Sequence, residues 1–303
     1  MIAHARRAAL AAALAVLPPV GAGATSFDSL RLCDRSSALS ATQQDRLLRF
    51  AAVARRELEH SGASVAVVSR SGLDLDRFGI RYSHAGLALR ASENATWSVR
   101  QLYYACDEAR PRLFDQGVAG FVSGTDDPSL GHVSILLLPA GNADSVALQA
   151  TALDRARALA LVAGRYSANA YAWSLAHQNC NQWLVELMAA AWGGARQRAE
   201  AQAWLAAQRY RPADVQVGSH AWMALAHLVP WLTREDHPQD DLYALRFRIS
   251  LPSSIEAFVR ERIAGVRRIE LCHDERRVVL RRDGAPIERG CVARDGDELT
   301  PLD

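Results

Sequence analysis

The sequence predicts an α+β protein in which an antiparallel sheet packs against helices. Two strand-like runs, 80–90 and 96–105, are joined by the polar stretch Ser92-Glu93-Asn94, which is typical of an antiparallel hairpin. Residues 132–139 are largely apolar and predict a central strand. An Ala-rich helix is expected at 145–165, ending at Gly164, and half of the residues are hydrophobic. A chain of this length and composition can bury a substantial core.

The remaining elements follow from local signals. Ser40-x-x-Gln43 is a capping box that opens a helix, and residues 63–69 form a buried strand. Helices are also expected at 195–209 and 218–232, the second ended or kinked by Pro230. After a strand-like run at 243–251, Ser253-x-x-Glu256 caps a short helix, and residues 267–273 and 276–284 alternate like paired strands. This tail either extends the main sheet or forms a small C-terminal subdomain.

The N-terminus predicts export. MIAHARR is basic, AALAAALAVLPPV is a short apolar stretch, and Ala22-Gly23-Ala24 is a small-residue cleavage pattern. We interpret residues 1–24 as a signal peptide cleaved near Ala24, which gives a periplasmic or secreted protein; an uncleaved anchor is the alternative. No later run reaches about 18 uninterrupted apolar residues, so no stable membrane span is expected after cleavage.

The charge pattern argues against nucleic acid as a partner. All 35 basic residues are arginine, and 33 acidic residues are interspersed among them, for a net charge of +2. A nucleic-acid-binding protein concentrates its basic residues on one face. No two histidines have the spacing H-x-x-x-H, so the sequence predicts no metal site and no cofactor.

The chain has five cysteines. In the oxidising compartment that export implies, cysteines tend to form disulfides. Cys272 and Cys291 flank β-type sequence in the tail and are the easiest pair to join. Cys33 and Cys106 are a plausible second pair, although even four cysteines allow three connectivities. Cys180 is then left as an unpaired thiol.

Cys180 opens a helix. Asn179 is a favoured N-cap and Gln182 has the spacing of a capping box, which places Cys180 in the first turn. Backbone N–H groups and the helix dipole there stabilise a thiolate, so we expect a lowered pKa and a nucleophile. The alternatives are a buried structural thiol and a disulfide partner.

A nucleophilic thiol needs a base, and His84 is the first candidate. It lies in a strand, and Gly86 follows two residues later on the same face, leaving space beside the imidazole for another backbone or a substrate. His132 is the next candidate, while His60, His237 and His273 are expected to be solvated. The alternative for His84 is a core imidazole that donates to a backbone carbonyl.

Two short motifs carry a resemblance. SHAGL at 83–87 and NCNQWLVE at 179–186 resemble the circularly permuted papain-like superfamily, which includes NlpC-type cell-wall peptidases and lecithin:retinol acyltransferase. From the first mature helix through 259, the chain also resembles an exported bacterial family, domain of unknown function 2145. The resemblance implies a permuted papain-like core at 25–240 followed by a β-rich extension at 241–303.

The resemblance also implies roles for residues. Gln101, on the strand after the histidine, would accept the imidazole N–H of His84 through its carbonyl. The Cys180 backbone N–H would help to hold an oxyanion, with Asn179 in support and Gln178 or Tyr82 as a second donor. The expected function is a cysteine hydrolase or acyltransferase acting on an amide or ester of a cell-envelope small molecule, peptide or lipid. The alternative is a non-catalytic periplasmic binding or scaffold protein that keeps the fold.

Overall fold

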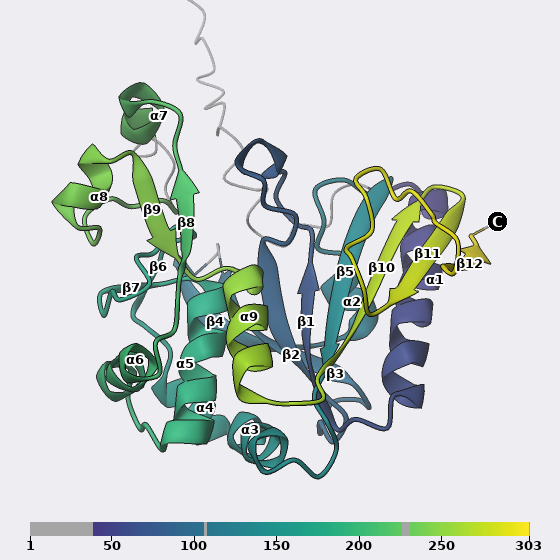
Figure 1. Cartoon of the computed structure of the whole chain (residues 1–303), viewed down its shortest axis with the longest axis horizontal. Helices are drawn as coiled ribbons and strands as arrows, with labels where there is room; N and C mark the ends of the chain where they lie inside the picture. The colour runs from purple at the N-terminus through teal and green to yellow at the C-terminus, as the bar shows by residue number, and fades with distance from the viewer. Residues whose placement is uncertain (1–38, 106–107, 226–230, 303) are drawn as a thin grey trace, which may run out of the picture.

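A computed structural model describes residues 39–105, 108–225 and 231–302 of the chain (Figure 1). The predicted signal peptide, Cys33, Cys106 and Pro230 lie outside these residues. The described part is a mixed α+β structure, as the sequence predicts, with helices on both faces of a large antiparallel sheet.

The main sheet has eight strands in the order β12-β11-β10-β5-β1-β2-β3-β4, and every neighbouring pair is antiparallel. The predicted apolar run becomes β5, which lies between β1 and β10 in the middle of the sheet. The predicted hairpin is formed by β2 and β3. The strand bounds are β1 Val65–Arg70, β2 His84–Leu89, β3 Ser98–Ala105, β4 Arg110–Gly117, β5 Leu130–Leu137, β10 Arg267–Asp274, β11 Arg277–Arg282 and β12 Glu298–Pro301.

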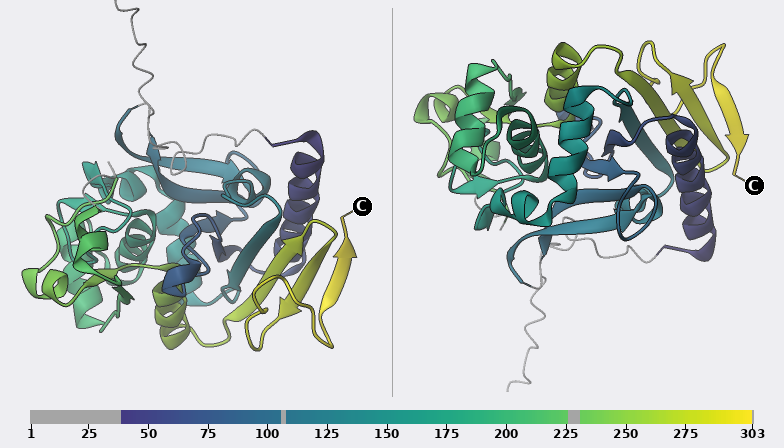
Figure 2. Two further views of the ribbon diagram at one scale, coloured as in Figure 1. Left: turned by 90° about the horizontal axis from the view of Figure 1, so that it is seen from above. Right: turned by 90° about the horizontal axis from the view of Figure 1, so that it is seen from below.

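Helices divide the core into two layers. On one face, α1 (Ala41–His60) and α2 (Val118–Val122) cover the even-numbered apolar residues of β1. On the other, α3 (Ala143–Leu153), α5 (Cys180–Gly193) and α9 (Pro252–Arg262) cover the odd-numbered ones. Figure 2 shows the purple α1 on one side of the molecule and the teal and green helices on the other. Alternation along a strand therefore decides which helix each side chain meets.

Several helix boundaries differ from the prediction. The helix expected at 145–165 is two helices, because Asp154 ends α3 and its carboxylate caps α4 (Arg155–Ala160). The helix expected at 195–209 is α6 (Arg198–Ala207). Of the helix expected at 218–232, the structure describes α7 (His220–Leu225), and residues 226–230 lie outside the described ranges. The C-terminal helix α9 starts with Pro252, and Ser254, not Ser253, bonds the preceding backbone N–H. Proline at the first helical position loses no hydrogen bond, which explains the earlier start.

A smaller layer lies at one end of the sheet (Figure 1). Its antiparallel pair is β8 (Ala213–Gln216) and β9 (Arg246–Ile249), next to α8 (Gln239–Tyr243). A short parallel pair, β6 (Arg165–Tyr166) and β7 (His177–Gln178), leads into α5. The 3-10 turn η2 (Asp76–Phe78) lies between β1 and β2.

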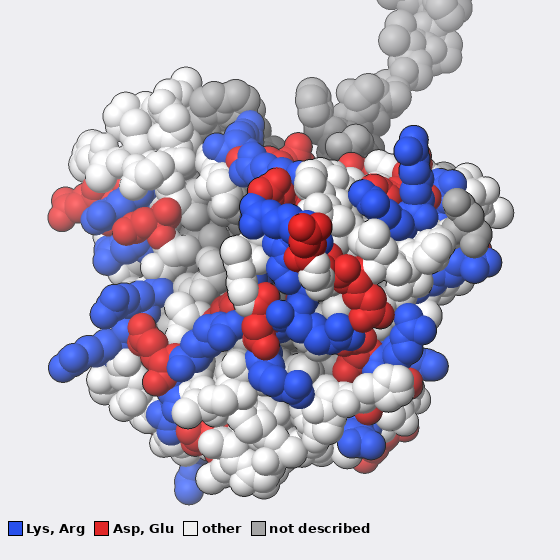
Figure 3. All heavy atoms as spheres, turned by 45° about the vertical axis from the view of Figure 1, so that its right-hand side comes forward, with Lys and Arg blue, Asp and Glu red and all other residues white. Residues whose placement is uncertain are grey.

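The tail strands β10, β11 and β12 extend the main sheet instead of forming a separate one. The predicted Cys272–Cys291 disulfide is confirmed; it joins β10 to the loop before β12. No helix of the described ranges has the length and hydropathy needed to cross a bilayer. On the face drawn in Figure 3, arginines and acidic residues alternate over the surface instead of separating into one basic patch.

Candidate functional site

The N-terminus of α5 forms as the sequence predicts. Asn179 is the N-cap, and its side-chain oxygen accepts the Gln182 N–H at 2.7 Å. The Asn179 amide nitrogen donates to the carbonyls of Ala168 and Ser250, both at 3.3 Å. Gln182 does not return a bond to Asn179, since its amide nitrogen donates to the carbonyls of Ala172 and Ser174 and to Glu186. The Asn179 side chain therefore supports the position of Cys180, and both of its amide N–H groups are committed to backbone carbonyls.

A buried carboxylate anchors this helix two turns further on. Glu186 accepts hydrogen bonds from Arg198, Gln178 and Gln202 at 2.6–3.1 Å. Burial raises the pKa of Glu186, and these donors oppose the rise. The Gln178 amide also accepts from the Ala163 N–H and donates to the Leu161 carbonyl, so the structure commits this side chain to the network and not to an oxyanion site.

The Cys180 thiol is free but buried, with 5 % of its surface exposed. Burial raises its pKa to about 11, although the N–H groups of Asn181 and Ala85, the Tyr166 hydroxyl and the Arg70 charge all favour the thiolate. The expectation of a lowered pKa is therefore wrong for this structure. Desolvation of the sulfur outweighs the stabilisation available at a helix N-terminus.

His84 and Gln101 are brought together as predicted. His84 Nε2 lies 2.7 Å from Gln101 Oε1, and Gln101 Nε2 donates to Gln116 Oε1 at 2.6 Å. Because the Gln101 nitrogen is committed to Gln116, its oxygen faces the imidazole and must accept from it. His84 is therefore protonated on Nε2, which leaves Nδ1 as a proton acceptor.

The imidazole lies in an apolar setting. Its ring centroid is 4.8 Å from that of Tyr103 and 5.9 Å from that of Phe121. Burial and the Arg70 charge lower the pKa of His84 to about 3, against the opposing effect of Gln101. At neutral pH the imidazole is therefore uncharged.

Cys180 and His84 lie at the same end of the sheet, near the start of β2, but on opposite faces of it. Cys180 packs with Ala85 and the α5 layer, whereas His84, one residue earlier in β2, packs against Phe121 of α2. Within the described ranges no hydrogen bond joins the two side chains. The structure thus brings His84 and Gln101 into contact and leaves the thiol beside them, around the end of β2.

Tyr82 and His132 lie elsewhere. The Tyr82 hydroxyl donates to Glu270, which also pairs with Arg81, so the structure does not bring Tyr82 to the thiol. Burial lowers the pKa of His132 to about 4, and this residue lies in β5 next to the disulfide strand β10.

Two further sequence interpretations need correction. The space at Gly86 is filled, because a Cβ there would lie 2.6 Å from Val99 Cγ1 and 3.2 Å from Gln101 Cβ; packing of β3 requires the glycine, and no substrate is needed to explain it. His237 and His273 are buried, contrary to the prediction that they are solvated. His273 packs on Phe50, with 4.6 Å between ring centroids.

Three neighbours of the site were not found from the sequence. Tyr166 reaches the thiol from β6 and stacks on Tyr104 at 5.3 Å. Gln116 comes from β4, a strand with alternating arginines that the periodicity did not indicate. Arg70 ends β1 opposite His84. Only the pairing register of the strands brings Tyr166, Gln116 and Arg70 to the end of the sheet where His84 and Cys180 lie.

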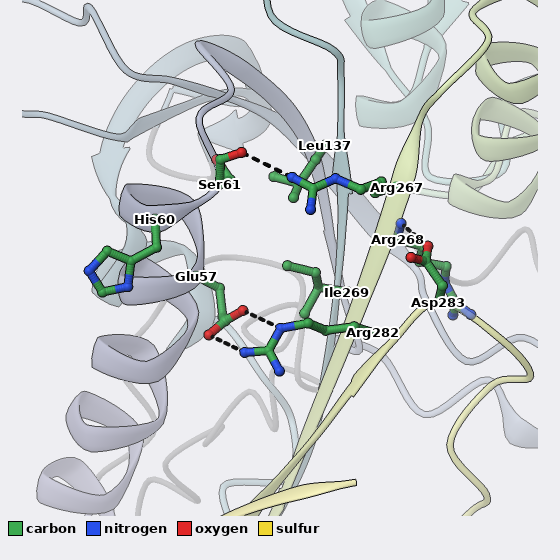
Figure 4. Close-up of a pocket in the computed structure, with 9 residues that line it drawn as sticks. All are labelled: Glu57, His60, Ser61, Leu137, Arg267, Arg268, Ile269, Arg282 and Asp283. Atoms are coloured by element: carbon green, nitrogen blue, oxygen red, sulfur yellow. Dashed lines mark hydrogen bonds and ion pairs between the residues drawn. The ribbon is translucent and has the colours of Figure 1, made fainter. Parts of the chain in front are cut away.

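A shallow hollow on the surface lies away from these residues. It measures about 220 Å³ and lies between the end of α1 and strands β10 and β11 (Figure 4). Its charged groups are already paired, since Arg282 holds Glu57 through two bonds and Arg267 donates to the Ser61 carbonyl. No cluster of three or more metal-ligating side chains occurs in the part of the chain that the structure describes.

The fold and the site define an α+β protein with a buried thiol on a helix tip beside an oriented imidazole. The chain belongs to the domain of unknown function 2145 family, whose model, described as an uncharacterized protein conserved in bacteria, matches residues 57–259. No curated protein and no solved structure matches the chain.

Proposed function

We propose that this protein is an exported thiol hydrolase or acyltransferase with a permuted papain-like core, acting on an amide or ester of a cell-envelope substrate. Cys180 is the nucleophile, His84 the base and Gln101 the residue that orients it. The observation that supports the proposal is the chain of bonds from Gln116 through Gln101 to His84, because it leaves Nδ1 ready to accept a proton.

The chemistry follows from these groups. His84 Nδ1 takes the thiol proton while the sulfur attacks the carbonyl carbon, and the carbonyl oxygen becomes an oxyanion. The Cys180 backbone N–H stabilises that charge, and so does the Tyr166 hydroxyl, which hydrogen-bonds the sulfur in the structure. The imidazolium then protonates the departing amine or alcohol, leaving a thioester that water or an amine resolves. Since the thiol and imidazole lie around the end of β2, the first proton transfer runs through a bridging water or a local shift of this edge.

Acylation provides the test. The folded protein is mixed with p-nitrophenyl acetate at neutral pH, and the acetyl group is located by intact mass and peptide mapping, which separates Cys180 from Cys33 and Cys106. We expect acetylation of Cys180 with release of p-nitrophenol, and a loss of about 10²-fold or more in its rate in His84→Asn. Cys180→Ser is the matched control of similar size. If folded protein stays unmodified at Cys180 while urea-unfolded protein reacts, the proposal fails.

A second candidate is a non-catalytic envelope binding protein. Its support is that burial keeps both groups uncharged at neutral pH, with the pKa of Cys180 at about 11 and that of His84 at about 3. In that case Cys180→Ala binds isolated cell-envelope fractions as the unmodified sequence does, and p-nitrophenyl acetate acylates neither of the two proteins at residue 180.

A further inference from the structure

The arginine at the end of β1 differs from the other buried arginines. Three of them hold a carboxylate: Arg100 pairs with Asp115 at 2.6 Å, Arg198 with Glu186 at 2.8 Å, and Arg268 with Glu270 at 3.1 Å. Arg70 is 5 % exposed, yet among the described residues it forms no ion pair with a carboxylate, and its Nε is buried without a partner.

The surroundings of Arg70 hold the guanidinium but do not neutralise it. One terminal nitrogen donates to the Tyr103 hydroxyl, Cζ lies 5.6 Å from the centre of the Phe121 ring, and Nε is buried without a partner. Gly72 leaves the room that the other terminal nitrogen occupies, because a Cβ there would lie 2.7 Å from Nη1. The group is thus built into the fold with hydrogen-bonding capacity unused.

A buried cation without a counterion is costly, since a desolvated charge loses its hydration and gains no partner. A planar guanidinium is suited to a carboxylate, which it can bind through two parallel bonds. Arg70 pairs with His84 across β1 and β2, and its charge acts on both His84 and Cys180. An anion bound there would therefore lie next to the reacting groups.

We propose that Arg70 binds a carboxylate of the substrate, so that the acyl donor carries a carboxylate near the bond that is attacked. This inference deepens the proposed function: the bound carboxylate belongs to a substrate only if Cys180 is the nucleophile. The anion site itself is a property of Arg70 and is present whether or not Cys180 reacts.

Thermal unfolding tests the anion site without catalysis. N-acetylglycine and its neutral counterpart N-acetylglycinamide are added to the full chain and to Cys180→Ala. At ten times its Kd, N-acetylglycine is expected to raise the unfolding midpoint by about 3–6 °C in both proteins, and the amide far less. Arg70→Gln loses the difference, Arg70→Lys keeps part of it, and the matched control Arg100→Gln keeps all of it.

A second measurement connects the site to the thiol. Cys180 is alkylated with iodoacetate and with iodoacetamide, and the ratio of rates is divided by the ratio for free glutathione. We expect a preference for iodoacetate of about tenfold or more, lost in Arg70→Gln. Equal shifts by the acid and the amide in both the full chain and Cys180→Ala overturn the Arg70 proposal, even if Cys180 is acylated. A shift specific to the acid with no acylation of Cys180 keeps the anion site and refutes the thiol enzyme.

Discussion

The carboxylate beneath the candidate nucleophile offers a quantitative test of how α5 is held. Glu186 is fully buried and its two oxygens accept five hydrogen bonds, two of them from Arg198. In Glu186→Gln one oxygen becomes an NH₂ group that faces donors, and Arg198 loses its counterion. Breaking a buried pair in this way costs about 3–5 kcal/mol of unfolding free energy.

That cost is measurable as heat stability. For a domain of this size, 1 kcal/mol corresponds to about 2–4 °C in the unfolding midpoint, so Glu186→Gln should lower it by about 6–20 °C. Calorimetry and urea unfolding of the two proteins give the value. The double variant Glu186→Leu with Arg198→Met removes both charges and should recover most of the loss. A loss under about 1 kcal/mol in Glu186→Gln would refute the reasoning that this charge pair anchors the helix.

Three further outcomes are expected. Reducing the Cys272–Cys291 disulfide, which closes a loop of 19 residues, should cost about 3 kcal/mol in urea unfolding, and unchanged stability would contradict this. Gly86→Ala should destabilise by about 1–3 kcal/mol because its Cβ meets Val99, whereas Gly117→Ala, with open space around it, should be neutral or slightly stabilising. The free energy of unfolding should fall as the pH drops from about 6.5 towards 4, because the imidazoles bind protons in the unfolded chain but stay neutral when buried. An unfolding midpoint that is constant over this pH range would contradict the lowered pKa values. These imidazoles are His84, His132 and His273.

Local signals made part of the fold predictable. The Ser40 capping box, the Asn179 cap and the hairpin of β2 and β3 each depend on residues close in sequence, and each is present. The Cys272–Cys291 pair was predictable because its two ends lie in one β-type segment. Such features need no knowledge of which face of the sheet is covered.

The candidate site was less predictable, because it depends on burial and strand register. The sequence indicates a thiol at the helix tip, at Cys180. Whether its pKa is raised or lowered depends on how deeply the N-terminus of α5 is buried. The contact between His84 and Gln101 follows from strand pairing, and so does the separation of His84 from Cys180. Arg70 carries no local sequence signal, since its burial without a carboxylate partner is visible only in three dimensions.

The position of β5 between β1 and β10 has a consequence for how the chain matures. Residues 130–137 lie in the interior of the finished sheet, yet their partner on one side, residues 267–274, is synthesised more than a hundred residues later. Until β10 arrives, β5 presents an apolar strand edge that can pair with other chains. Folding is thereby tied to completion of the C-terminus, and chains truncated before β10 should aggregate rather than persist as smaller folded proteins.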